Sequence, residues 1–241
     1  MAIKLKKIPE ILINLVFPRR CPVCDEIVVP FGELVCPTCH AGIRYVSEPT
    51  CIKCGKEMNQ EEEEYCHDCA NKVHQYERGM ALYGYKGMSD SIYRFKYRGR
   101  QEYAQFYGME LAEHLGDRIR GLHADALIPV PIHFTKKRKR GYNQAQLIAA
   151  QLSKQLQIPM YSGLISRCRK TAPQKDLSGK ERQNNLKKAF KMNRNDVKLD
   201  TIVIIDDIYT TGSTIDAMAD VLKSAGVTHV YYVALAIGDG I

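Results

Sequence analysis

Eight of the nine cysteines form four CxxC pairs, and this spacing points directly to metal chemistry. The pairs are Cys21/Cys24, Cys36/Cys39, Cys51/Cys54 and Cys66/Cys69. Two such pairs supply four thiolates, the complete tetrahedral ligand set of a structural zinc ion. Eleven residues separate the first pair from the second, and eleven separate the third from the fourth, so the unit repeats once. The pattern predicts a tandem zinc ribbon over residues 21–72 that holds two structural zinc ions.

The spacing leaves open which pairs share an ion. Equal spacers favour sequential pairing, first with second and third with fourth, but a cross-braced arrangement of alternate pairs satisfies the same count. Disulfides would need an oxidising compartment, a redox CxxC is normally single, and iron–sulfur clusters use other spacings. His40 and His67 adjoin the pairs, and with four thiolates available for each ion we expect both to face solvent.

A second chemical pattern lies in residues 201–226. A β-branched apolar run, Ile202–Ile205, is typical of a buried parallel strand and ends at Asp206 and Asp207. A loop of small residues and then an amphipathic helix follow; the loop consists of Thr210, Thr211, Gly212, Ser213 and Thr214. Such a loop presents backbone N–H groups and the positive end of a helix dipole to an anion. The two acids would repel phosphate, so we expect them to hold sugar hydroxyls and, through water, Mg²⁺.

Positive charge is concentrated in the middle of the chain. The net charge is −2 over residues 1–80, +14 over 81–200 and −4 over 201–241. A segment this basic predicts an anionic partner such as nucleic acid or a polyphosphate; a solvated basic face is the alternative. The candidate contacts to DNA or pyrophosphate are Arg98, Lys136, Lys137, Arg138, Lys139, Arg140, Lys180 and Arg182.

The elements around these cations are predicted as follows. Residues 126–131 form a strand, the run 136–140 is a basic loop at its C-terminal end, and a helix begins near Asn143. Residues 167–190 are basic, polar and poor in strand signals, which suits a lid over the ligand. Residues 93–100 interleave aromatic and cationic side chains, as base stacking with phosphate neutralisation requires, although aromatic residues at this spacing are as often core.

The N-terminal segment, residues 1–20, predicts a short amphipathic helix. Its apolar run is too short to cross a membrane, and no small-residue cleavage site follows it. We therefore expect a cytoplasmic protein without stable membrane insertion.

The segment IVIIDDIYTTGST, residues 202–214, resembles the phosphoribosyl pyrophosphate (PRPP) fingerprint of type I phosphoribosyltransferases. The resemblance implies an α/β domain with a parallel sheet over residues 78–241. It also implies that Asp206 and Asp207 contact the ribose hydroxyls, that residues 210–214 cradle the 5′-phosphate, and that Mg²⁺ accompanies PRPP.

A wider resemblance, to the ComF family of competence proteins of the ComFC type, covers nearly the whole chain. It rests on the CxxC pairs, the fingerprint, and the segments RFKYRG (94–99), RGYNQ (140–144), Gln174, Arg182, Asn185 and Phe190. It implies a role in natural transformation, with single-stranded DNA and a DNA-translocating ATPase as partners, at the inner face of the membrane.

Two functions from different classes follow. One is a PRPP-binding factor that handles single-stranded DNA during uptake. The other is an active phosphoribosyltransferase with an unidentified nucleobase or amine acceptor. The sequence shows a complete donor-side fingerprint but no recognisable acceptor site, and His133 is the one candidate general base, with a structural role favoured for it. Whether the chain is an enzyme stays open at this stage.

Overall fold

The computed structural model describes residues 18–59, 62–168, 189–193 and 197–238. Most of the predicted N-terminal helix (1–20) lies outside these residues. By its internal contacts the chain divides into two compact units, residues 1–43 and 44–241. The first four-cysteine set belongs to the smaller unit, and the second set belongs to the same unit as the sheet.

The smaller unit is built around two tight turns. An antiparallel bridge joins Arg20 to Ile27 on either side of the first CxxC. Helix α2 (Pro37–Ala41) begins directly after Cys36, with proline in its first turn, where the missing N–H is not needed.

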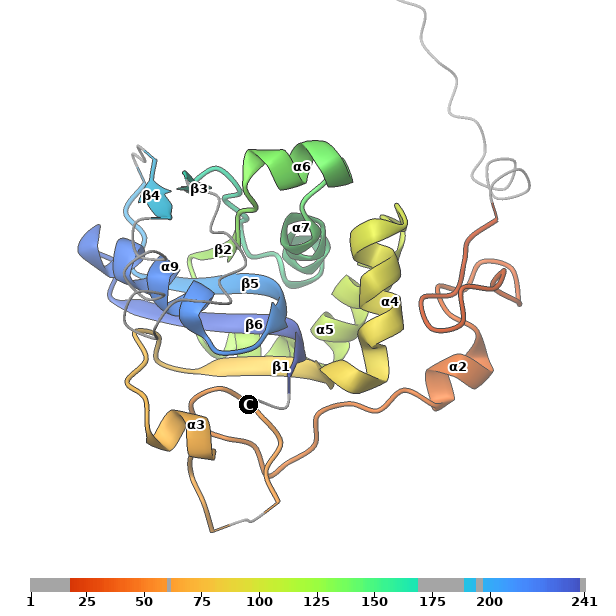
Figure 1. Ribbon diagram of the computed structural model, residues 1–241, viewed down its shortest axis with the longest axis horizontal. Helices are drawn as coiled ribbons and strands as arrows, with labels where there is room; N and C mark the ends of the chain where they lie inside the picture. Colours follow the sequence, from red (N-terminus) through yellow and green to blue (C-terminus); the bar gives the residue numbers. More distant parts are fainter. Residues whose placement is uncertain (1–17, 60–61, 169–188, 194–196, 239–241) are drawn as a thin grey trace, which may run out of the picture. The chain divides into compact units, whose positions relative to one another are not determined.

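The larger unit contains a four-stranded parallel sheet in the order β1 (Gly79–Gly84), β6 (His229–Ile237), β5 (Thr201–Tyr209) and β2 (Ala126–Pro129) (Figure 1). Ile204 of β5 pairs with Ile128 on one side and Tyr232 on the other. Consecutive residues of β5 and β6 are buried, and because successive side chains point to opposite faces, both faces of the sheet are covered. The predicted parallel α/β fold is confirmed.

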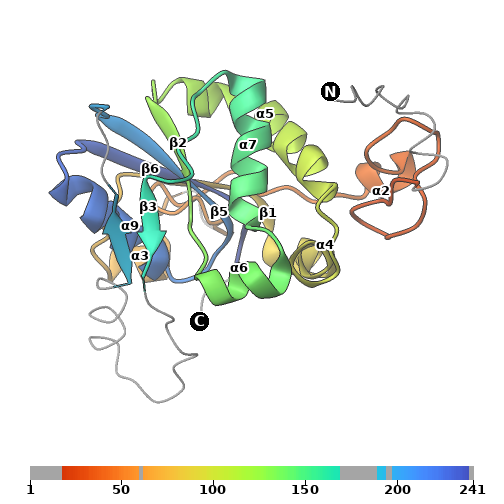
Figure 2. The same ribbon diagram turned by 90° about the horizontal axis from the view of Figure 1, so that it is seen from above.

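Helices and the cysteine-containing segment cover the sheet. Helices α5 (Tyr103–Arg120) and α7 (Gln144–Leu156) lie side by side (Figure 2) and pack on β1, β2 and β5. Helix α9 (Ser213–Ser224) packs on β6, and α4 (Tyr85–Tyr97) leads away from the end of β1. The short helix α3 (His67–Ala70) lies in the second cysteine set. Among the described helices, none is long and apolar enough to span a membrane.

Several local predictions are wrong. The strand predicted over residues 126–131 ends at Pro129. The basic run predicted as a loop forms helix α6 (Phe134–Arg140), which begins after His133 as N-cap and ends at Gly141, whose φ is +83°. The strand predicted to end at Asp206 continues to Tyr209, because parallel pairing with β6 extends beyond the apolar run.

The predicted lid is flanked by a short antiparallel pair, β3 (Ile165–Arg167) and β4 (Phe190–Met192). The interior of the lid, with Lys180 and Arg182, lies outside the described residues.

Candidate phosphate-binding site and zinc sites

The eight paired cysteines gather into two groups of four. Cys21, Cys24, Cys36 and Cys39 form the first site, and Cys51, Cys54, Cys66 and Cys69 form the second site; within each, the sulfur atoms lie within 4.8 Å of one another. Sequential pairing is therefore correct. The Cys54 and Cys66 Sγ atoms are 3.7 Å apart, which matches the edge of about 3.8 Å in a tetrahedron with Zn–S bonds of about 2.3 Å. Both ligand sets fit structural zinc.

The four thiols of each site lie so close together that they shift one another's pKa values. Burial, with hydrogen bonding to Cys24, raises the pKa of Cys39 to about 12, whereas hydrogen bonds from Cys54 and Cys69 lower the pKa of Cys51. Four neighbouring sulfurs cannot all carry charge unless a metal neutralises them. The side chain of His67 is 91% exposed, as expected for a residue that is not a ligand.

The phosphate loop, residues 210–214, joins β5 to α9, but Ser213 and Thr214, which the sequence placed in the loop, form the beginning of α9, so residues 210–212 make the connection. Gly212 is the N-cap of α9 with φ +72°, and a Cβ there would lie 2.5 Å from the Tyr209 hydroxyl oxygen. Glycine is thus required both by the left-handed backbone and by the close approach of Tyr209. Thr210 and Thr211 are exposed, and the Thr211 and Ser213 hydroxyls are 3.0 Å apart. The loop can offer helix N-terminal N–H groups and hydroxyls to a phosphate.

The acid pair, Asp206 and Asp207, lies at the end of β5 just before this loop. Burial and the neighbouring charge of Asp207 raise the pKa of Asp206 to about 8, although Lys96 and Arg167 partly offset the shift. Asp207 is neutralised by Lys96, whose Nζ is 3.0 Å from its Oδ1. Asp207 as a carboxylate and Asp206 as a carboxyl group that loses its proton only near pH 8 can both accept hydrogen bonds from sugar hydroxyls.

A basic surface, defined by residues of α4 and α6, adjoins the acid pair. A cavity of about 360 Å³ lies there, lined by Lys96, Tyr97, Gly99, Lys136, Lys139 and Arg140. Burial and the positive charges of Arg167, Arg140 and Lys96 lower the pKa of Lys136, while Asp207 acts in the opposite direction. These cations are therefore close enough to repel one another, and the positive potential that they share favours the binding of an anion.

Exposed aromatic rings lie beside these cations. The rings of Tyr93 and Tyr97 are 5.0 Å apart between centroids, and both side chains are exposed. The Arg140 guanidinium lies 4.7 Å from the centre of the Tyr97 ring. Phe95, between the two tyrosines in sequence, is fully buried. In segment 93–100 the two tyrosines therefore lie on the surface, whereas Phe95 belongs to the core.

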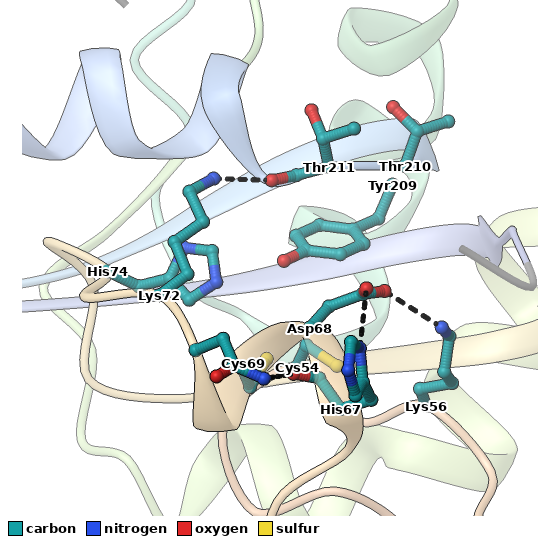
Figure 3. Close-up of a pocket in the computed structure, with 11 residues that line it drawn as sticks. Cys54, Lys56, His67, Asp68, Cys69, Lys72, His74, Tyr209, Thr210 and Thr211 are labelled. Carbon is teal, nitrogen blue, oxygen red and sulfur yellow. Dashed lines mark hydrogen bonds and ion pairs between the residues drawn. The ribbon is translucent and has the colours of Figure 1, made fainter. Parts of the chain in front are cut away.

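A second cavity, of about 240 Å³, lies between the phosphate loop and the second site (Figure 3). Residues of α3 and of the chain that follows it form one wall, and Tyr209, Thr210 and Thr211 form the other. Figure 3 shows the hydroxyls of Thr210 and Thr211 on the side of the loop away from the cysteines.

Comparison with protein families decides the class of the larger unit. A family model described as a phosphoribosyl transferase domain matches residues 109–239, more than half of the chain. The chain belongs to the phosphoribosyl transferase domain family. A second model, the double zinc ribbon domain, matches residues 12–70.

Curated relatives of this phosphoribosyl transferase domain protein carry competence and DNA-utilization names. It is 38% identical to Competence protein F of Haemophilus influenzae over 46% of this chain and 50% of that protein. It is 35% identical to DNA utilization protein YhgH of Escherichia coli K12 (59% and 64%) and 28% identical to Competence protein ComFC of Bacillus subtilis (58% and 55%). The matches therefore span between half and somewhat under two thirds of each relative's length. They confirm the predicted resemblance to the ComF family.

Solved phosphoribosyltransferases also align with the chain. A purine phosphoribosyltransferase from Pyrococcus horikoshii Ot3 is 18% identical over 55% of this chain and 73% of that one, with a TM-score of 0.36. A hypoxanthine phosphoribosyltransferase from Staphylococcus aureus is 15% identical over 57% and 64%, also with a TM-score of 0.36.

The structure brings together only some of the residues of this phosphoribosyl transferase domain protein that were predicted to contact DNA or pyrophosphate. Lys136, Lys139 and Arg140 line the cavity of the basic surface. Lys137 and Arg138 are exposed on α6, and Arg98 is the exposed C-cap of α4. His133 is buried and caps α6, because its Nδ1 accepts from the Thr135 backbone N–H; the same Nδ1 is 2.9 Å from the Thr135 hydroxyl oxygen.

Two site residues were missed from the sequence. Lys96 pairs with Asp207, and Arg167 on β3 lies near Asp206. Lys96 lies in segment 93–100, whose alternating aromatic and cationic side chains could have indicated it. Arg167 opens the segment predicted as a lid, and its position next to the acid pair depends on the β3–β4 pairing.

Proposed function

We propose that this protein binds PRPP at the phosphate loop and single-stranded DNA along the basic surface, as a competence factor that supports DNA uptake in natural transformation. The observation that carries the proposal is the continuity of the two features. Asp207, three residues before the loop, is paired at 3.0 Å with Lys96, and Lys96 lines the basic cavity. The segment that leads into the phosphate loop and the basic surface thus adjoin one another.

The donor side of the site suits PRPP. Residues 210–214 would hold the 5′-phosphate at the N-terminus of α9, and the acid pair would hold the ribose hydroxyls. Mg²⁺ is usually bound by one or two carboxylates together with substrate phosphates, so the acid pair fits it, and the ion would neutralise the pyrophosphate. Lys96, Lys136 and Arg167 supply further positive charge beside the acids.

The basic surface suits a single strand. Tyr93 and Tyr97 offer exposed rings on which bases can stack, and Arg140 over Tyr97 combines a ring with a cation. The names of the relatives, competence and DNA utilization, agree with such a role. A DNA-translocating ATPase at the cytoplasmic face of the inner membrane is the partner that this role implies.

The PRPP proposal is tested by calorimetric titration with PRPP and Mg²⁺. Ser213→Asp places a negative charge in the first turn of α9, where it stabilises the helix but repels phosphate. We expect at least about tenfold weaker binding, because a like charge replaces a donor at the anion site. Ser224→Asp, an exposed position at the other end of the same helix, is the control and should bind as the wild type does. A wild type that does not bind PRPP, or a Ser213→Asp variant with unchanged affinity, would contradict the proposal.

The DNA proposal is tested by fluorescence anisotropy with a labelled oligo-dT over a series of salt concentrations. Lys136→Gln with Lys139→Gln should weaken binding and lower the slope of log K against log salt by about 1–2. The control pair is Lys154→Gln with Lys198→Gln, two exposed lysines outside the basic cavity. Equal losses in both double variants would indicate nonspecific attraction and count against this surface.

Active transfer is the second candidate function, because the sequence carries a complete fingerprint of the phosphoribosyltransferase type at the end of β5. A turnover assay that measures pyrophosphate release separates it from binding alone. The binding-only proposal predicts no increase when a nucleobase or an amine is added. Acceptor-dependent release would establish an enzyme.

A further inference from the structure

The second site is part of the core that supports the phosphate loop. Its four cysteines share one buried cluster with Ile215 and Met218 of α9. The Tyr232 hydroxyl of β6 donates to the Cys54 carbonyl oxygen at 2.7 Å, and the Gly79 N–H donates to the Lys53 carbonyl oxygen at 2.8 Å. The Cys51–Cys54 turn of the second site is therefore hydrogen-bonded directly to β1 and β6.

The chain that leaves the second site carries Lys72 to the loop. Its Nζ donates to the Thr211 carbonyl oxygen at 2.7 Å (Figure 3). The same Nζ lies 3.3 Å from an Asp216 carboxylate oxygen in the first turn of α9. Lys72 follows Cys69 by three residues, so its position depends on the geometry of the second site.

The next residues hold the same turn of α9. His74, with a nearly buried side chain, places Nδ1 3.0 Å from Asp216, and the Gln75 N–H donates to Asp216 at 2.9 Å. The Tyr76 and Tyr209 hydroxyl oxygens are 2.8 Å apart. Residues 72–76 thus contact both the last residue of β5 and the beginning of α9, on either side of the phosphate loop.

The contact of Lys72 with Thr211 fixes the direction of one peptide plane. In a trans peptide the C=O and the following N–H point in opposite directions. With the Thr211 carbonyl oxygen held by Lys72, the Gly212 N–H points away from Lys72. A free carbonyl could instead turn toward a bound phosphate and repel it, so this contact favours the orientation that presents a donor.

We propose that Lys72, on the chain that leaves the second site, is a positioning residue for the phosphate loop and strengthens its binding of a 5′-phosphate. This inference rests on the proposed PRPP site. The contacts that carry it all lie within residues 51–232, so it concerns the second site and not the first.

Three variants test the role of Lys72 in the full chain with both zinc ions bound. Lys72→Met removes the donor to Thr211, and Lys72→Arg keeps a cationic donor. Lys56→Met removes a different cation that lines the same cavity, where Lys56 pairs with Asp68 at 3.2 Å. The probes are PRPP with Mg²⁺ and ribose 5-phosphate, both titrated by calorimetry. The amide NMR signal of Gly212 in the ligand-free protein is an independent readout.

We expect Lys72→Met to bind both probes about tenfold more weakly, the effect of one lost charge-assisted hydrogen bond. Lys72→Arg should stay within about threefold of the wild type and Lys56→Met should be unchanged. The Gly212 amide signal should shift in Lys72→Met and not in Lys56→Met.

Two results would overturn the inference alone: wild-type affinity in Lys72→Met, or equal losses in Lys72→Met and Lys56→Met, which would indicate a general charge effect. If the wild type binds neither probe, the proposed PRPP function fails, and an unmoved Gly212 signal in Lys72→Met would then refute the anchoring role separately.

Discussion

The first and second cysteine sites have the same ligand spacing and different surroundings. In both, the residue after the first CxxC has a left-handed backbone and donates to the first cysteine: Asp25 to Cys21 at 2.9 Å and Gly55 to Cys51 at 2.8 Å. Yet all four cysteines of the second site are buried, whereas Cys24 of the first site is exposed. A repeated metal motif can thus serve as a self-contained turn in one copy and as part of a domain core in the other.

Loss of a ligand should separate the two sites most strongly. We expect Cys54→Ser to destabilise the sheet unit by about 3 kcal/mol or more, because it removes metal-binding energy from a buried cluster. Cys24→Ser should leave that unit within about 0.5 kcal/mol of the wild type. Urea unfolding followed by far-UV circular dichroism measures both, with zinc content determined alongside. Equal destabilisation by the two variants would remove the distinction.

The left-handed position gives a matched pair of substitutions. A Cβ at Gly55 would lie 2.8 Å from the Gly79 carbonyl oxygen, so Gly55→Asp should cost about 2–4 kcal/mol. The reverse change in the first site, Asp25→Gly, should stay within about 1 kcal/mol, because glycine adopts this backbone freely. Urea unfolding of each unit gives the values, and a mild effect of Gly55→Asp would show that β1 can move away.

Metal removal should also distinguish the sites. With excess of a colorimetric chelator we expect two phases of zinc release, the first at least about tenfold faster, because opening a buried cluster requires local unfolding. Cys24→Ser should lack the fast phase. Release of both ions from the wild type at a single rate would contradict this prediction.

The smallest contrast concerns one hydrogen bond in each site. Tyr232→Phe removes the donor to the Cys54 carbonyl and should cost the sheet unit about 1 kcal/mol, since the bond is buried. Arg20→Met removes the bond of Arg20 to the Asp25 carbonyl oxygen, which is 3.0 Å long and only partly buried, and should cost the first site less than about 0.5 kcal/mol. Thermal unfolding at matched zinc content resolves the difference.

The sequence predicted correctly those features that depend on residues close together in the chain. Equal spacers predicted that Cys51 shares a metal site with Cys66, and the apolar run with its glycine loop predicted β5, the loop and α9. The run of five cations was predicted as a loop between a strand and a helix, whereas it forms α6 between the capping residues His133 and Gly141, although like charges on a helix repel one another. The extension of β5 through Asp206 depends on pairing with β6, and no neighbouring residue indicates it.

Long-range contacts were beyond the sequence. Nothing near Lys72 indicates that it reaches Thr211, 139 positions later, or that Cys54 meets Tyr232, 178 positions later. The pairing of Lys96 with Asp207 depends likewise on how α4 lies at the end of the sheet.

The contact between Cys54 and Tyr232 also bears on synthesis. The ligands and backbone bonds of the first site lie between Arg19 and Ile43, so this site can close soon after its residues leave the ribosome. The four ligands of the second site lie within residues 51–69, but its buried surroundings form only when β6 (His229–Ile237) has emerged to pair with β1. Until then its four thiols are without their buried surroundings, and a nascent chain that stalls before residue 229 would present them to oxidants and foreign metals.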